Sequence, residues 1–122
     1  DRDAGAIRAA KANAERAGVA GDITFREAAI SMLEPPAGTG ALVSNPPYGV
    51  RVGERGPLRD LFARLGQVVR ERLPGWSVTL LLTATPLERE TRLSFHEAFA
   101  TSNGGLRVRG LTTLNSDRGG PT

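Results

Sequence analysis

The 122 residues are enough for one domain built around a single hydrophobic core. A hydrophobic share of 39% and a charged share of 24% are typical of a globular protein, and no apolar run is long enough to span a membrane, so we expect a soluble protein of the cytoplasm. The sequence has no cysteine and a single histidine, His96, which excludes disulfides and thiolate metal sites and predicts chemistry without a metal.

Arginine supplies nearly all of the positive charge. Lys11 is the only lysine among 16 cationic residues, and the formal net charge is +3. The planar guanidinium suits the recognition of phosphates and bases. A GC-rich genome produces the same enrichment, so the charge permits a nucleic-acid partner without requiring one.

The first predicted element is a short, alanine-rich helix. The sequence opens with Asp1-Arg2-Asp3 and passes directly into the helical pattern, as expected if it begins inside a longer domain. Asp3 can cap the helix, and Gly18 can end it in the left-handed conformation. Its apolar positions are Ile7, Ala10, Ala14 and Ala17.

Two short strand candidates follow. Residues 23–26 form the first, and a loop rich in proline and glycine covers residues 34–40. The run from Ala41 to Ser44 is continuously apolar up to its last residue, which favours a strand of a parallel sheet that is buried on both faces. It ends at Asn45-Pro46-Pro47, because two consecutive prolines cannot donate to a ladder.

A long helix and a second strand come next. Apolar residues repeat at spacings of three and four from Pro57 to Leu73, and Pro74-Gly75 ends the pattern. Residues 76–83 read as the strongest strand, opened by Trp76, which we expect in the core rather than as a stacking platform. A strand, a long helix and a strand predict a right-handed parallel crossover.

The last predicted element is an antiparallel hairpin. Residues 93–101 and 106–114 flank Asn103-Gly104, a dipeptide that tolerates the positive φ of a tight turn. His96 falls in the first of these strands, and we assign it no role. Residues 116–122 are small, polar and rich in glycine, so we expect a disordered tail.

The residues that point to a chemistry are Asn45, Pro46 and Pro47. In an open parallel sheet, ligands bind beyond the carboxyl ends of the strands, and Asn45 directly follows such a strand. The prolines restrict the backbone, so the amide oxygen of Asn45 and the carbonyl oxygen of Pro46 can accept hydrogen bonds from one amine. An exocyclic base amine is a poor nucleophile, and two such bonds return electron density to its nitrogen for attack on a methyl sulfonium.

Tyr48 and Gly49 complete this segment. The tyrosine ring can stack on a base, which contributes about 1–3 kcal/mol, and the glycine lets the backbone pass close to a substrate. Arg51 and Arg55 follow and can contact phosphates, with a solvated loop as the alternative. The tetrapeptide itself also fits a plain proline-rich turn, and it is the surrounding strands and helix that favour the functional interpretation.

Several motifs occur together over nearly the whole chain. They are Asp1-x-Asp3, Ala10-x-x-Asn13-Ala14, the run from Ala41 to Gly53, the Leu61-Phe62-x-x-Leu65-Gly66 helix and Asn103-Gly104-x-Leu106. In these motifs the chain resembles the THUMP-associated RNA guanine-N2 methyltransferases. DNA adenine-N6 and cytosine-N4 methyltransferases share the Asn-Pro-Pro-Tyr signature without the glycine, so a DNA enzyme, or a non-catalytic RNA-binding remnant, stays open as an alternative.

The resemblance implies an α/β fold of the Rossmann-like class I methyltransferase type, with S-adenosylmethionine as cofactor and ribosomal or transfer RNA as substrate. It implies a catalytic set of Asn45, Pro46, Pro47 and Tyr48. Asp1 would hold the cofactor ribose hydroxyls, with Asn45 also at the cofactor, while Gly49, Arg51 and Arg55 would contact RNA.

The resemblance also implies a truncated domain over residues 1–115. In the family, a glycine-rich cofactor loop precedes the position of Asp1, and two further strands separate the strands at residues 23–26 and 41–44. An isolated chain would therefore expose sheet edges, and we expect it to form a homodimer or to be poorly stable. The family's acidic adenine-binding residue aligns with Ala29, where Glu27 is the nearest substitute, and Val50 stands where relatives place glutamate.

Overall fold

The computed structural model describes residues 1–47, 55–83 and 86–113. They form two compact units, Asp1–Glu34 and Pro35–Thr122, and each is described by itself. The first unit holds helix α1 and two short 3₁₀ turns, and the second holds a four-stranded sheet with helix α2. Whether residues 1–115 form one domain stays a prediction.

Helix α1 runs over Ala4–Ala17, as predicted. The Asp3 carboxylate accepts a hydrogen bond from the backbone N–H of Gly5 at 3.0 Å, which satisfies one of the free donors of the first turn. Gly18 ends the helix at φ 75°, and its N–H bonds back to the last turn. The 3₁₀ turns η1 (Ala20–Asp22) and η2 (Ile30–Met32) follow.

The strand predicted over residues 23–26 is wrong. These residues have no strand assignment, and the backbone hydrogen bond to Arg26 comes from Asp1, whose amino group donates to the Arg26 carbonyl at 3.1 Å. The Ala28 N–H in turn donates to the Asp1 carbonyl at 2.9 Å. These two bonds are the pattern of one parallel bridge, and one bridge is too short to make a ladder.

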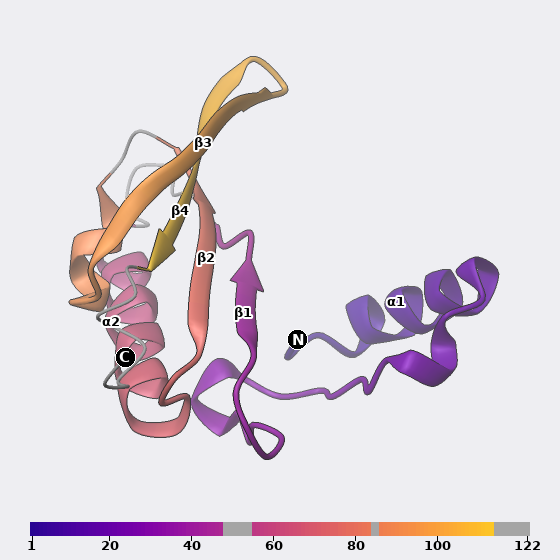
Figure 1. Ribbon diagram of the computed structural model, residues 1–122. Coiled ribbons are helices and arrows are strands. Elements are labelled where there is room, and N and C mark those ends of the chain that lie inside the picture. The colour runs from indigo at the N-terminus through magenta and orange to yellow at the C-terminus, as the bar shows by residue number, and fades with distance from the viewer. Residues whose placement is uncertain (48–54, 84–85, 114–122) are drawn as a thin grey trace. The chain divides into compact units, whose positions relative to one another are not determined.

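The sheet of the second unit has the strand order β1-β2-β4-β3. Strand β1 (Ala41–Ser44) lies parallel to β2 (Ser77–Leu82), and helix α2 (Arg55–Arg72) comes between them in the chain (Figure 1), so the predicted parallel crossover is confirmed, while its right-handedness stays a prediction. Strands β3 (Phe95–Asn103) and β4 (Leu106–Thr113) form the predicted antiparallel hairpin, with β4 beside β2.

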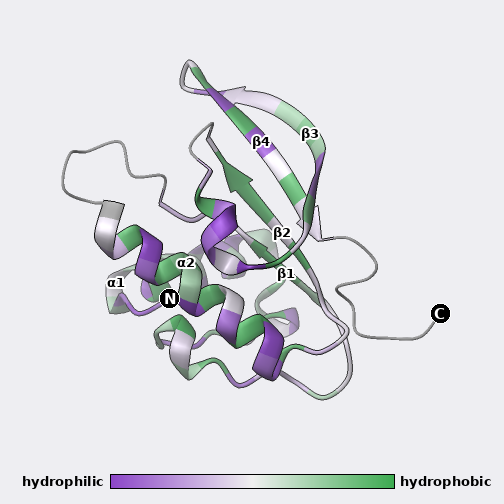
Figure 2. Cartoon of the chain, turned by 90° about the vertical axis from the view of Figure 1, so that its left-hand side faces the viewer, coloured by the Kyte–Doolittle hydropathy of each residue, from purple (hydrophilic) through white to green (hydrophobic). Residues whose placement is uncertain are grey.

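The core of this unit lies between α2 and one face of the sheet. Alternate residues of β2 are buried, and Figure 2 shows β2 as an almost continuous hydrophobic strand. The buried side chains come mainly from α2, β2 and β4: Leu58, Phe62, Leu65, Val68, Val69, Leu73, Val78, Leu80, Leu82, Val108 and Leu111. The apolar stripe predicted for the helix is therefore the face of α2 that packs against the sheet.

Strand β1 is not buried on both faces, in contrast to the prediction. Its residues alternate between exposed and half-buried, and Val43 is 70% exposed. The reason is position, because among the described strands β1 lies at the edge of the sheet and pairs with β2 alone. A continuous apolar run is typical of a central strand but does not by itself place a strand in the centre.

Two further predictions need correction in detail. The hairpin turn consists of Gly104 and Gly105, at φ 58° and 83°, one residue later than the predicted Asn103-Gly104, since β3 continues through Asn103.

Trp76 precedes β2 and is half-buried rather than in the core. Its indole N–H donates to the Gly38 carbonyl at 3.2 Å, so the ring fixes the loop before β1. The predicted tail, residues 116–122, lies outside the described residues.

Candidate active site

The Asn45-Pro46 corner lies at the carboxyl edge of the sheet. Strand β1 ends at Ser44, which pairs with Leu80, two residues before β2 ends at Leu82. Both parallel strands therefore end on the same side, where open α/β sheets bind their ligands. Asn45 is exposed and Pro46 is half-buried, so the corner is at the surface and not in the core.

This placement is what an acceptor for an amine requires. Pro46 and Pro47 carry no N–H, so the polar atoms that they offer are carbonyl oxygens. The amide oxygen of Asn45, an exposed residue, adds an acceptor. The corner follows a hydrogen-bonded strand, which restricts the backbone from which these oxygens project.

The other residues of the predicted catalytic and RNA-binding set do not belong to this described corner. Tyr48, Gly49 and Arg51 lie outside the described residues. Arg55 begins helix α2, eleven residues after the end of β1 at Ser44. The structure therefore brings together Asn45, Pro46 and Pro47, and the roles of the other four residues stay predictions.

Asp1, the predicted cofactor ligand, is held in place within the first unit. Its amino group and carbonyl make the two backbone bonds of the bridge to residues 26–28. One carboxylate oxygen accepts a hydrogen bond from the Asp3 N–H at 2.8 Å, while the residue remains exposed. Asp1 is thus not a frayed terminal residue, and its oriented carboxylate fits the two hydroxyls of a ribose as an acceptor.

Glu27 is the residue paired with Asp1 in this bridge, because the bonds run to the residues on either side of it. Paired residues on neighbouring strands lie about 5 Å apart. Ala29, which aligns with the family's acidic position, precedes the short turn η2 in an extended conformation. Glu27 is therefore closer to Asp1 in the backbone pairing than Ala29 is, and its substitution for the missing carboxylate stays a prediction.

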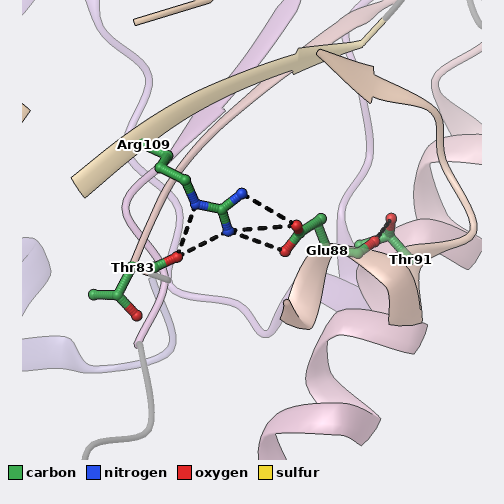
Figure 3. A network of polar contacts seen from close by, with 4 residues as sticks. All are labelled: Thr83, Glu88, Thr91 and Arg109. Carbon is green, nitrogen blue, oxygen red and sulfur yellow. Dashed lines mark hydrogen bonds and ion pairs between the residues drawn. The ribbon is translucent and has the colours of Figure 1, made fainter. Parts of the chain in front are cut away.

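Sequence reasoning missed a polar network at the end of β2. The guanidinium of Arg109 on β4 donates to the Thr83 carbonyl from Nε at 3.1 Å and from Nη2 at 2.9 Å (Figure 3). It also forms an ion pair with Glu88, at 3.3 Å from Nη2 to Oε1. A charged residue inside the apolar pattern of β4 was the available signal, but nothing in the sequence identifies a partner 21 residues away.

The described residues contain neither a candidate metal site nor a candidate membrane-spanning helix. In residues 1–47, 55–83 and 86–113, histidines and carboxylates do not form a group of three or more that could hold a metal ion. None of the helices in these ranges is both long and apolar enough to cross a bilayer.

Comparison with known proteins decides the family. The family model described as UPF0020, RMKL-like methyltransferase domain, matches residues 1–110. The chain belongs to this methyltransferase family. The α/β fold of the class I methyltransferase type expected from the resemblance is confirmed, while the THUMP association and the role of the Asn-Pro-Pro-Tyr segment are not tested by this match.

The chain is similar to parts of longer proteins. It is 38% identical over 113 residues to ribosomal RNA large subunit methyltransferase K/L of Syntrophotalea carbinolica, covering 89% of this chain and 16% of that protein. It is 41% identical over 104 residues to the protein of the same name from Alteromonas mediterranea, covering 84% and 15%. A solved structure of a predicted N6-adenine-specific DNA methylase from Listeria monocytogenes matches 90% of this chain and 28% of its own, with 29% identity and a TM-score of 0.72.

Proposed function

We propose that the protein transfers a methyl group from S-adenosylmethionine to an exocyclic amine of a nucleic-acid base, and that the base is guanine, methylated at N2 in ribosomal or transfer RNA. The observation that carries the proposal is the Asn45-Pro46 corner, with Asn45 exposed, at the carboxyl end of β1, beside the carboxyl end of β2. Membership of the RMKL-like methyltransferase family supports it. The ribosomal RNA methyltransferases that the chain matches favour RNA over DNA.

The residues of this chain would act on the amine. The oxygens of Asn45 and Pro46 accept hydrogen bonds from the two N–H groups, which draws the nitrogen toward a tetrahedral geometry and restores its lone pair. S-adenosylmethionine supplies an electrophilic methyl group when bound. A bond forms from the nitrogen to the methyl carbon, the bond from that carbon to sulfur breaks, and the amine then loses one proton to water. Tyr48 would stack on the base, with Gly49, Arg51 and Arg55 beside the RNA.

The cofactor is assigned to the first unit. The anchored carboxylate of Asp1 fits the ribose hydroxyls, and Glu27 next to it fits the adenine amine. The predicted cofactor role of Asn45 stays part of the proposal. Since the chain spans 16% and 15% of the ribosomal RNA methyltransferases that it matches, we assign the activity to the product of the complete gene, acting in the cytoplasm.

A methyl-transfer assay tests the proposal. The complete gene product is incubated with labelled S-adenosylmethionine and either total RNA or genomic DNA, and the modified nucleoside is identified after digestion. N2-methylguanosine is the expected product. N6-methyladenine or N4-methylcytosine in DNA would instead support the second candidate, which the Listeria structure's name favours.

For this chain in isolation we propose self-association. Strand β1 is an edge strand whose face at Val43 is exposed, and such edges pair readily with a second copy.

A further inference from the structure

One guanidinium joins two segments at the carboxyl end of β2. Arg109 binds the carbonyl of Thr83, the residue that follows β2, with two of its nitrogens. Its terminal nitrogens also bind the carboxylate of Glu88, which lies in the 3₁₀ helix η3 (Leu87–Thr91). Both partners are largely buried, with 21% of the Arg109 side chain and 18% of the Glu88 side chain exposed. Ion pairs this sheltered keep their geometry better than surface pairs.

The register places this network beside the candidate site. Arg109 pairs with Leu82, the last residue of β2, and β2 is the parallel neighbour of β1, which leads to Asn45. Neighbouring strands lie about 5 Å apart, so Arg109 is two strands from the corner and does not touch it. Its effect on the corner would pass through the end of β2.

The other side of the network is fixed to helix α2. Thr91 is fully buried, and its hydroxyl donates to the Glu88 carbonyl at 2.6 Å and accepts from the Leu93 N–H at 3.1 Å. Arg70 of α2 donates to the Thr91 carbonyl. Gly66 of α2 lies so close to that carbonyl that a Cβ there would be 1.9 Å from its oxygen. The turn that carries Glu88 is therefore packed against helix α2 and hydrogen-bonded to it.

We propose that Arg109 is a positioning residue for methyl transfer. It ties the carboxyl end of β2 to η3 and α2, and so fixes the edge of the sheet at which the Asn45-Pro46 corner meets the base. The inference rests on the proposed function, because it assigns Arg109 a part in the same reaction. Arginine is required since one planar guanidinium reaches a carbonyl and a carboxylate at once, and the single ammonium of lysine cannot reproduce that fork.

The test compares Arg109→Met, Arg109→Lys and Glu88→Gln in the complete gene product. Displacing the edge of the sheet that holds the catalytic corner slows the reaction, so Arg109→Met is expected to lower kcat about 10- to 100-fold. The rate is divided by the concentration of S-adenosylmethionine-binding sites, determined by titration. The KM for RNA should change less than about threefold. Glu88→Gln keeps the contacts with Thr83 and should lose less. Arg109→Lys keeps the charge, should fold even if the methionine variant does not, and should show an intermediate kcat.

Arg107→Met is the matched control. Arg107 lies on the same strand two residues earlier, is exposed and is paired with Ser102 rather than with β2, so its kcat should equal that of the wild type. If the Arg109 variants lose thermal stability but keep the wild-type kcat per binding site, the residue is only structural and this inference is overturned while the proposed function stands. If the wild-type protein transfers no methyl group to any nucleic acid, the proposed function itself fails.

Discussion

Gly66 is the residue at which helix α2 meets the turn after β2. A Cβ at this position would lie 1.9 Å from the Thr91 carbonyl oxygen and 2.6 Å from its carbon. These are backbone atoms of a buried turn, so they cannot move aside easily. We expect Gly66→Ala to lower the free energy of unfolding by about 1–3 kcal/mol, measured by native-state hydrogen exchange of the α2 amides in the complete gene product.

The matched control is Gly56→Ala in the same helix. A Cβ at Gly56, in the first turn of the helix, would have no atom within 4 Å, so alanine there should change the free energy of unfolding by no more than about 0.5 kcal/mol. Equal effects of the two substitutions would show that Gly66 serves no packing role.

At the scale of single residues, the sequence predicted the hydrogen-bond acceptors of the candidate site better than it predicted the residues that hold the nearby strand end in place. The position of Asn45 and Pro46 was predictable, because a strand followed by two prolines must end there. Asp1 could be predicted only through the resemblance. The network of Arg109, Glu88 and Thr83 could not be predicted, because its partners meet only after β4 has paired with β2.

The β3–β4 hairpin depends on its two-residue turn. Gly104 and Gly105 have φ 58° and 83°, values that are strained for residues with a branched Cβ. Gly104→Val is expected to reduce hairpin stability by about 1–2 kcal/mol. Asparagine tolerates this conformation, so Gly104→Asn should stay near the wild type. Amide exchange of residues 95–113 measures both, and equal protection in the two variants would contradict the assigned turn.

Elements with a strong period were predictable, and short ones were not. The three-and-four spacing over residues 57–73 gave α2 to within two residues of its ends. Residues 23–26 and 41–44 are only four residues each, and their pairing depends on which strands lie beside them. The strand character of the first and the burial of the second were therefore mispredicted for the same reason, the lack of neighbouring strands on both sides.

At the scale of the whole molecule, the sheet has an open edge at β1. The 122-residue chain expressed alone should be dimeric or unfold at low temperature, because the described residues of its second unit do not cover the edge and the exposed Val43 face. Small-angle scattering and thermal unfolding test this together. A monomeric scattering profile with a cooperative transition at high temperature would contradict the prediction.

The central claim is that Asn45 and Pro46 hold the amine that is methylated. The most direct measurement is methyl transfer by the complete gene product carrying Asn45→Ala, with His96→Ala as control, since His96 is exposed on β3 and has no assigned role. Removing one preorganised hydrogen-bonding partner of a reacting group costs about 100- to 1000-fold in kcat. We predict a loss of that size for Asn45→Ala, with a melting temperature near the wild-type value and full activity in the control. Undiminished transfer by Asn45→Ala would contradict the account.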